Sequence, residues 1–148
     1  MQTIDRILVT TDFSETSKMA FSLARQVAAK FDAEIDLLHV LDAQLPSLVC
    51  EPSGVGAGES EQQRVERAAS RLEALAAQLG EGVETMVTTG TPHVEIVKFA
   101  EDNAIDLTVM ATHGRGFFSH VIMGSTTERV VRRAPCPVLT VRDQSLDN

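Results

Sequence analysis

ILVTTDFSETSKMAFSLARQVAAKF, residues 7–31, contains the unit that decides the fold. Residues 7–10 form a short apolar and largely β-branched run, which is typical of a buried strand. From residue 15 the apolar residues recur every three or four positions, which predicts a helix over residues 15–31. Its apolar face contains Met19, Ala20, Leu23, Ala24, Val27 and Phe31. The stretch therefore predicts a strand that leads directly into an amphipathic helix.

The same alternation repeats through the rest of the chain. Further strands are expected over residues 33–41, 83–89, 105–112 and 137–141, and further helices over residues 59–79, 91–103 and 126–133. Gly80 or Gly82 is expected to end the second helix, and Thr91 with Pro92 to start the third. This order predicts an α/β protein with right-handed crossovers. We expect one domain over residues 1–148, with an open, twisted, parallel five-stranded sheet and helices on both faces.

Composition narrows the classes of partner. The 148 residues carry a formal net charge of −8, and the 13 basic residues are scattered. A field of this sign repels nucleic acid and acidic membrane surfaces. No run approaches the roughly 20 apolar residues of a membrane span, and the N-terminus lacks the pattern of a secretory leader. We therefore expect a cytoplasmic protein with no nucleic-acid or membrane partner.

Two cysteines and one long segment complete the survey of the chain. Cys50 and Cys136 are far apart in the sequence, and in a reducing compartment we expect two free thiols. Residues 43–58 are rich in Gly, Pro and Ser, which predicts a mobile loop within the domain. Nothing in this loop identifies a partner.

The segment after the fourth expected strand is the main candidate for a site. Gly114 and Gly116 follow that strand, and Gly124 precedes the last helix. Glycines allow a ligand to approach the backbone, and the free amides of a helix N-terminus favour an anion. The pattern is therefore consistent with a phosphate cradle. The alternative is that Ser125 and Glu128 form a capping box and the glycines only turn the chain.

Other phosphate-binding patterns do not fit this segment. It contains no lysine, so the GxxxxGK[ST] loop is absent, and Ser119 stands where the GxGxxG pattern needs its third glycine. A second candidate lies at the end of the first strand. Asp12 there either caps the following helix, as Ser14 could, or contacts a ribose or a metal.

These segments together resemble the universal stress protein family over nearly the whole chain. The resemblance rests on ILVTTDFSETS at 7–17, LLHVLD at 37–42, TGTPHVEIVKFAEDNAIDLTVMATHG at 89–114 and GSTTERVVRRAPCPVLTV at 124–141. It implies an adenine nucleotide alpha hydrolase-like fold and a nucleotide-dependent switch or sensor in a stress response. The ATP-binding branch carries the pattern GxxGx9G[ST]. Gly114, Gly124 and Ser125 match it, and Ala111 replaces its first glycine.

The resemblance also implies a site, a cofactor and an assembly. Thr10 and Asp12 would lie beside the adenosine, and Val40 would contact the adenine through its backbone. The ribose and phosphates would be lined by Ala111, His113, Gly114, Arg115, Gly116 and Phe117, and the phosphate tail by Gly124, Ser125, Thr126 and Thr127. ATP would carry Mg²⁺ through its phosphates. A homodimer would form through the strand Pro137–Val141. Alanine at 111 fits if its backbone is extended, and weakens binding if it requires positive φ or touches the ribose.

Some alternatives to ATP binding remain open, and the residues present argue against others. His113 and Ser125 have no identified catalytic partner, so no catalytic residue is assigned, although slow ATP hydrolysis stays open. A phosphoacceptor receiver domain needs an aspartate after the third strand and a lysine after the fifth, and both are missing. A flavin site is disfavoured because the chain has no Trp or Tyr. The principal rival is a dimer that acts through protein partners without a nucleotide.

Overall fold

The computed structural model describes residues 3–43, 58–112 and 123–142, and these contain nine alternating strands and helices. In chain order they are β1 (Arg6–Thr10), α1 (Glu15–Phe31), β2 (Glu34–Asp42), α2 (Glu61–Leu79), β3 (Glu84–Gly90), α3 (Pro92–Asp102), β4 (Leu107–Ala111), α4 (Ser125–Arg133) and β5 (Val138–Val141). The expected order of elements is confirmed. Most of the expected 43–58 loop, together with Cys50, lies outside the described residues.

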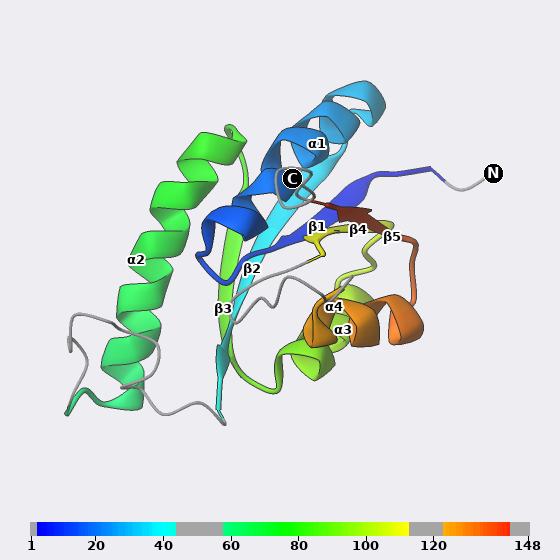
Figure 1. Cartoon of the computed structure of the whole chain (residues 1–148). Helices are drawn as coiled ribbons and strands as arrows, with labels where there is room; N and C mark the ends of the chain where they lie inside the picture. The colour runs from blue at the N-terminus through cyan, green and yellow to red at the C-terminus, as the bar shows by residue number, and fades with distance from the viewer. Residues whose placement is uncertain (1–2, 44–57, 113–122, 143–148) are drawn as a thin grey trace, which may run out of the picture.

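The strands form one parallel sheet in the order β3-β2-β1-β4-β5. Helices α1 and α2 cover one face, and α3 and α4 cover the other (Figure 1). The order reverses between β1 and β4, which lie side by side at the centre. In open sheets of this kind ligands bind beyond the carboxyl ends of the strands at such a reversal. The topology therefore points to the ends of β1 and β4.

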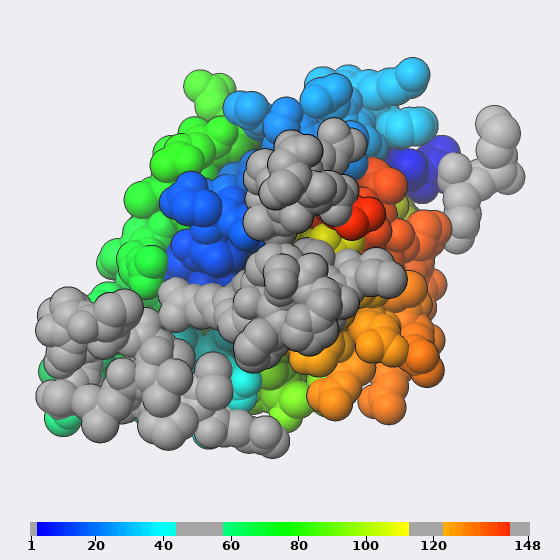
Figure 2. Space-filling model, viewed as in Figure 1, coloured from blue at the N-terminus to red at the C-terminus, as the bar shows by residue number. Residues whose placement is uncertain are grey.

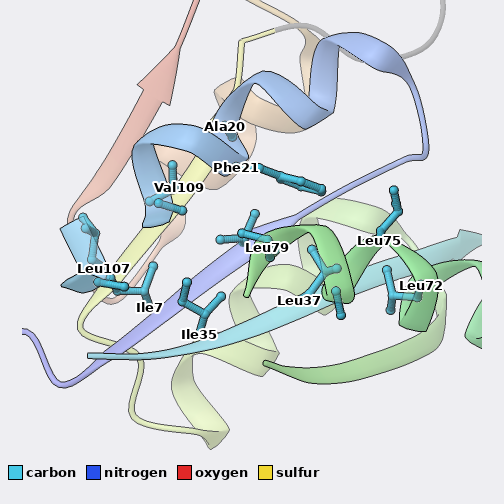
Figure 3. Close-up of a cluster of buried hydrophobic side chains, with 14 residues drawn as sticks. Ile7, Ala20, Phe21, Ile35, Leu37, Leu72, Leu75, Leu79, Leu107 and Val109 are labelled. Carbon is cyan, nitrogen blue, oxygen red and sulfur yellow. The ribbon is translucent and has the colours of Figure 1, made fainter. Parts of the chain in front are cut away.

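The larger core lies between the sheet and the α1–α2 layer (Figure 3). Every second residue of the central strands enters it, as period-two alternation requires, and α2 contributes residues three and four positions apart. The fully buried members are Ile7, Val9, Ala20, Ala24, Leu37, Leu72 and Val109, each 0% exposed. The intervening strand residues Leu8 and Leu38 pack on the other face with Ile96, Ala100 and Val130 of α3 and α4. Both faces of the central strands are buried, which explains their continuous apolar runs.

The helix ends follow from local hydrogen bonding. Ser14 is the N-cap of α1 and accepts a hydrogen bond from the amide of Ser17. Ser60 and Gln63 form a complete capping box at the start of α2, which the sequence analysis did not identify, and Gly80 ends that helix as expected. Thr91 is the N-cap of α3 as expected, although its side chain makes no capping bond.

Charged residues join the strands at the opposite, amino edge of the sheet. The Arg6 guanidinium in β1 donates to both carboxylate oxygens of Asp36 in β2, from Nε at 2.7 Å and from Nη2 at 3.2 Å. This pairing with Asp36, which is buried, raises the pKa of Arg6. Asp106 accepts from the amides of Asp5 and Arg6, both at 3.0 Å. These polar contacts hold β1, β2 and the segment before β4 in register, away from the carboxyl edge.

Candidate functional site

A cavity of about 380 Å³ opens at the carboxyl edge of the sheet, and we call it the carboxyl-edge cavity. It is lined by the ends of β1, β2 and β4 and by the N-terminal parts of α2, α3 and α4. Figure 2 shows the flanks of this region, with the blue and green atoms of α1 and α2 on one side and the orange atoms of α4 on the other. The cavity lies where the strand order reverses, as the topology predicts.

Most of the predicted site residues meet at this cavity, although they come from four separate parts of the chain. The lining includes Thr10, Asp12, Val40, Ala111, Gly124, Ser125, Thr126 and Thr127. The remaining predicted residues, His113, Gly114, Arg115, Gly116 and Phe117, lie outside the described residues. The fold therefore brings together the segment at the end of β1 and the segment at the start of α4, as the family resemblance implies.

The turn between β1 and α1 is fixed by its own side chains. The Thr11 amide donates to the carbonyl of Leu38 at 3.0 Å, and the Thr11 hydroxyl accepts from the amide of Phe13 at 3.0 Å. Asp12 Oδ1 accepts from the amide of Ser14 at 2.9 Å. The Ser17 hydroxyl, which contacts Thr11 Oγ1, donates to the Ser14 carbonyl at 2.8 Å. Asp12 therefore supports the turn before α1, while Ser14 caps the helix, so the two residues suggested as alternatives take different roles.

Phe13 is held in a conformation that a non-glycine residue rarely adopts. Its φ is 68°, in the left-handed region, which costs free energy unless the surroundings enforce it. Its ring lies 4.3 Å from the ring of His39, centroid to centroid, and the Arg71 guanidinium lies 4.2 Å from its centroid. His39 is buried, and its Nδ1 donates to the Thr11 carbonyl at 2.8 Å. The stack joins the end of β1 to β2 and α2.

The start of α4 differs from the capping box expected at Ser125 and Glu128. The N-cap is Gly124, without a side-chain capping bond, and Ser125 is already the first helical residue. Glu128 instead pairs with Arg132 at 2.9 Å, one turn further along. The expectation was wrong by one position, because the Gly124 carbonyl accepts the first helical bond, from the Glu128 amide at 3.0 Å.

This helix start nevertheless offers backbone donors at the cavity. Since the Glu128 amide makes the first helical bond, the amides of Ser125, Thr126 and Thr127 have no partner within the helix. The Gly124 amide donates to the Thr112 carbonyl at 2.6 Å, which holds the helix start against the end of β4. The Thr127 hydroxyl donates to the Ala111 carbonyl at 2.9 Å. The fixed amides and the helix dipole favour an anion at this end of the cavity.

Ala111 fits its position without backbone strain. It is the last residue of β4, it is 7% exposed, and it is absent from the residues with positive φ. Gly124 likewise has φ −64° and ψ 153°, which other residues also adopt. Its backbone conformation therefore does not require glycine, and Gly124 brings no side chain to the lining of the cavity.

Sequence reasoning missed three arginines of the site. Arg64, Arg67 and Arg71 of α2 line the cavity, one and two turns apart along the helix. Their spacing of three and four residues is a visible signal, because it places them on one face of a helix. The spacing does not show what this face contacts, and a charged stripe on a helix usually faces solvent.

Acidic residues line the middle of the cavity. Asp12 at the end of β1 and Asp42 at the end of β2 both belong to its lining. Among the described residues, no group of three His, Cys, Asp or Glu side chains could hold a metal ion. None of the helices in the described residues has the length and the apolar composition of a membrane span.

The lining of the cavity can hold a ligand with an anionic group at the start of α4 and with hydrogen-bond donors near Asp12.

Comparisons with known proteins identify the family and agree with the fold. A model of the universal stress protein family matches residues 3–142. Universal stress protein MJ0577 of Methanocaldococcus jannaschii is 32% identical over 152 residues, which cover 93% of this chain and 94% of that protein. The solved structure of MJ0577 matches with a TM-score of 0.77 at 29% identity, over 97% of this chain and 99% of that one.

Two more distant structures were solved with nucleotides bound. One is a universal stress protein in complex with cAMP, with a TM-score of 0.62 and 24% identity over 95% of this chain and 98% of that one. The other is an Archaeoglobus fulgidus protein in complex with dAMP, with a TM-score of 0.58 and 18% identity over 95% and 98% of the two chains. At these identities the likeness concerns the fold.

Proposed function

Because this chain belongs to the universal stress protein family, we propose that it binds ATP in the carboxyl-edge cavity and acts as a nucleotide-dependent switch or sensor in a stress response. The observation that carries the proposal is that one cavity contains both the amides at the start of α4 and the side chain of Asp12. Relatives of the same fold that bind cAMP and dAMP support an adenine nucleotide as the ligand class.

In this proposal each part of the cavity binds one part of the nucleotide. The backbone at Val40 contacts the adenine, and Thr10 and Asp12 lie beside the adenosine. The amides of Ser125, Thr126 and Thr127 donate to the phosphate tail, where the α4 dipole adds to the attraction. Predicted contacts from His113, Gly114, Arg115, Gly116 and Phe117 complete the site. Mg²⁺ would enter with the phosphates, whose charge it offsets.

Two features of the cavity support its fit to the phosphate tail. The extended backbone of Ala111 and its bond to the Thr127 hydroxyl satisfy the condition under which alanine replaces the family's glycine without strain. Gly124 has an ordinary φ, so its small size serves close approach by a ligand. A side chain at 124 should therefore interfere with the phosphates more than with the fold.

Calorimetric titration of Mg·ATP into protein stripped of nucleotide tests the proposal, with GTP as the control ligand. We expect saturable binding of ATP at micromolar affinity or tighter, which corresponds to about −8 kcal/mol or more. Gly124→Val should abolish binding while the circular dichroism spectrum stays unchanged, and Ala77→Val, at an exposed position of α2 outside the cavity lining, is the control and should bind ATP as the wild type does. Absence of binding up to millimolar ATP would contradict the proposal and favour the nucleotide-free dimer.

A further inference from the structure

The charges around the carboxyl-edge cavity are distributed unevenly. Apart from His39, the charged side chains among its described lining residues are Asp12 and Asp42 on the strand ends and three arginines on α2. We call Arg64, Arg67 and Arg71 the α2 arginines. The chain as a whole carries a net charge of −8, so a cavity side made of three positive groups departs from the average surface. Asp12, Asp42 and Glu59, which pairs with Arg67, balance this charge over the region as a whole, so the attraction for an anion is confined to the α2 side of the cavity.

The α2 arginines lie on the side of the cavity opposite to α4. Helix α2 belongs to the layer on one face of the sheet and α4 to the layer on the other, with the strand ends between them (Figure 1). The α4 amides already provide one anion-binding end. The cavity therefore has a positive end at α4, acidic residues in the middle and a positive end at α2. A matching ligand has hydrogen-bond donors in its middle and an anionic group at each end.

Two of the α2 arginines are held in place by contacts with neighbouring side chains. The Arg71 guanidinium stacks over the Phe13 ring at 4.2 Å, and Arg67 Nη2 lies 3.0 Å from Glu59 Oε2. Stacking on an aromatic face leaves the edge of a guanidinium able to donate hydrogen bonds in its plane. For Arg71, a planar fork that is already oriented by this stack matches two phosphate oxygens at a smaller entropic cost than a mobile side chain, whereas at Arg67 a phosphate would compete with the Glu59 carboxylate.

The nearby acids define which part of a nucleotide can lie between the two ends. Asp12 Oδ1 accepts a hydrogen bond from the Ser14 amide. The Asp12 carboxylate would repel a phosphate in direct contact, but it can accept hydrogen bonds from the hydroxyl groups of a sugar. In the proposed site Asp12 lies beside the adenosine, so the ribose lies between α4 and α2. Its 5′ substituent is directed to α4. Its 2′ and 3′ positions, on the other side of the ring, are then the positions from which a substituent can reach α2.

We propose, on the basis of the function proposed above, that the α2 arginines form a second anion subsite for a phosphate on the 2′ or 3′ position of the ribose. The ligand class that fills both ends is an adenosine phosphorylated on both sides of its sugar, with the 5′-phosphate at the α4 amides. Nucleotides with only a 5′-phosphate occupy the cavity without the α2 contacts and bind more weakly.

The test compares adenosine 3′,5′-bisphosphate with AMP by calorimetric titration into the full chain. We expect the bisphosphate to bind about tenfold tighter or more, as one additional charge-assisted phosphate contact requires. In the Arg67→Gln/Arg71→Gln variant the ratio of the two affinities should fall to about twofold or less, whatever change the AMP affinity itself shows. Arg25→Gln/Arg132→Gln removes the same charge from α1 and α4 and should keep the advantage. Thermal melts of all variants report whether they fold.

Each outcome decides the proposal. Equal affinity of the wild-type protein for AMP and the bisphosphate would overturn the second subsite while leaving nucleotide binding intact. Equal weakening of both ligands in the arginine variant would show that the side chains act on the base or the fold, which also overturns it. If the Arg25→Gln/Arg132→Gln control also binds the bisphosphate no more tightly than AMP, the difference in affinity comes from the net charge of the protein, which again overturns the second subsite. Absence of binding by either ligand would remove the proposed function itself. If the glutamine variant fails to fold, Arg67→Lys/Arg71→Lys keeps the charge and should lose part of the advantage.

Discussion

Single residues at the carboxyl edge show how one position can serve both the fold and the site. Asp12 supports the turn before α1 through the Ser14 amide, and it also lines the cavity. Thr127 is buried and donates its hydroxyl to Ala111, so what it presents to a ligand is its backbone amide. At this scale the sequence proposed residues that line one cavity, but not which atoms of each are already engaged, because those bonds depend on partners from distant elements.

His93 gives a prediction at the residue scale. It lies near the start of α3, where desolvation by burial, followed by the charges of Arg129 and Arg133, lowers its pKa below the ordinary value of 6.5. The folded state therefore binds this proton less readily than the unfolded state. The contribution of His93 to the free energy of unfolding is present above the pKa of the unfolded state, and it is lost as the pH falls through the lower pKa of the folded state.

Proton NMR titration of the His93 ring measures this directly. We expect a midpoint below 6.5, and in Arg133→Gln a midpoint moved upward, because one repelling charge is removed. Arg132→Gln is the matched control, since Arg132 is paired with Glu128 and is not among the causes of the shift. A wild-type midpoint at or above the ordinary value would contradict the assignment.

At the scale of elements, the sequence predicted the order and the type of the strands and helices, and their limits to within two residues. The continuous apolar runs indicated strands buried on both faces, and the three- and four-residue periodicity indicated helices. Helix starts were less predictable. Gly124 caps α4 in place of Ser125, and Ser60 with Gln63 forms the capping box of α2, because capping depends on where the chain enters the helix as well as on residue type.

The capping box of α2 carries a prediction about stability. Ser60→Ala removes an acceptor for the Gln63 amide and should lower the free energy of unfolding by about 1 kcal/mol. Urea denaturation followed by circular dichroism measures the change. Ser70→Ala, at an exposed position of the same helix, is the control and should change the free energy by less than about 0.5 kcal/mol. An equal effect of both substitutions would mean that the box adds nothing to stability.

At the scale of the whole molecule, the amino and carboxyl ends of the strands carry different features. Arg6, Asp36 and Asp106 join the strands at the amino edge, and the cavity lies at the carboxyl edge. The sequence predicted the carboxyl edge as the site, because the strand ends at Thr10 and Ala111 carry its candidate residues. It did not predict the α2 arginines, because the approach of α2 to the strand ends is a tertiary contact that periodicity does not encode.

The predicted homodimer belongs to this scale as well. Strand β5 is one edge of the sheet, and its Leu139 is 37% exposed, so it offers backbone groups and an apolar side chain to a second copy. Sedimentation velocity should give twice the chain mass of 16.0 kDa, and Leu139→Arg should shift the protein toward monomer. Met86→Arg changes an exposed residue on the opposite edge strand β3 and should leave the mass unchanged. The reverse pattern would assign the contact to β3.

The position of the α2 arginines along their helix has a consequence for the history of the fold. The buried residues of α2 begin at Ala68, so Arg64 and Arg67 precede the part of the helix that the core requires. Substitutions at these two positions can change which ligands are preferred at little cost in stability. If the proposed sensor function holds, proteins that share this sheet and these helices can therefore differ in the ligand they detect.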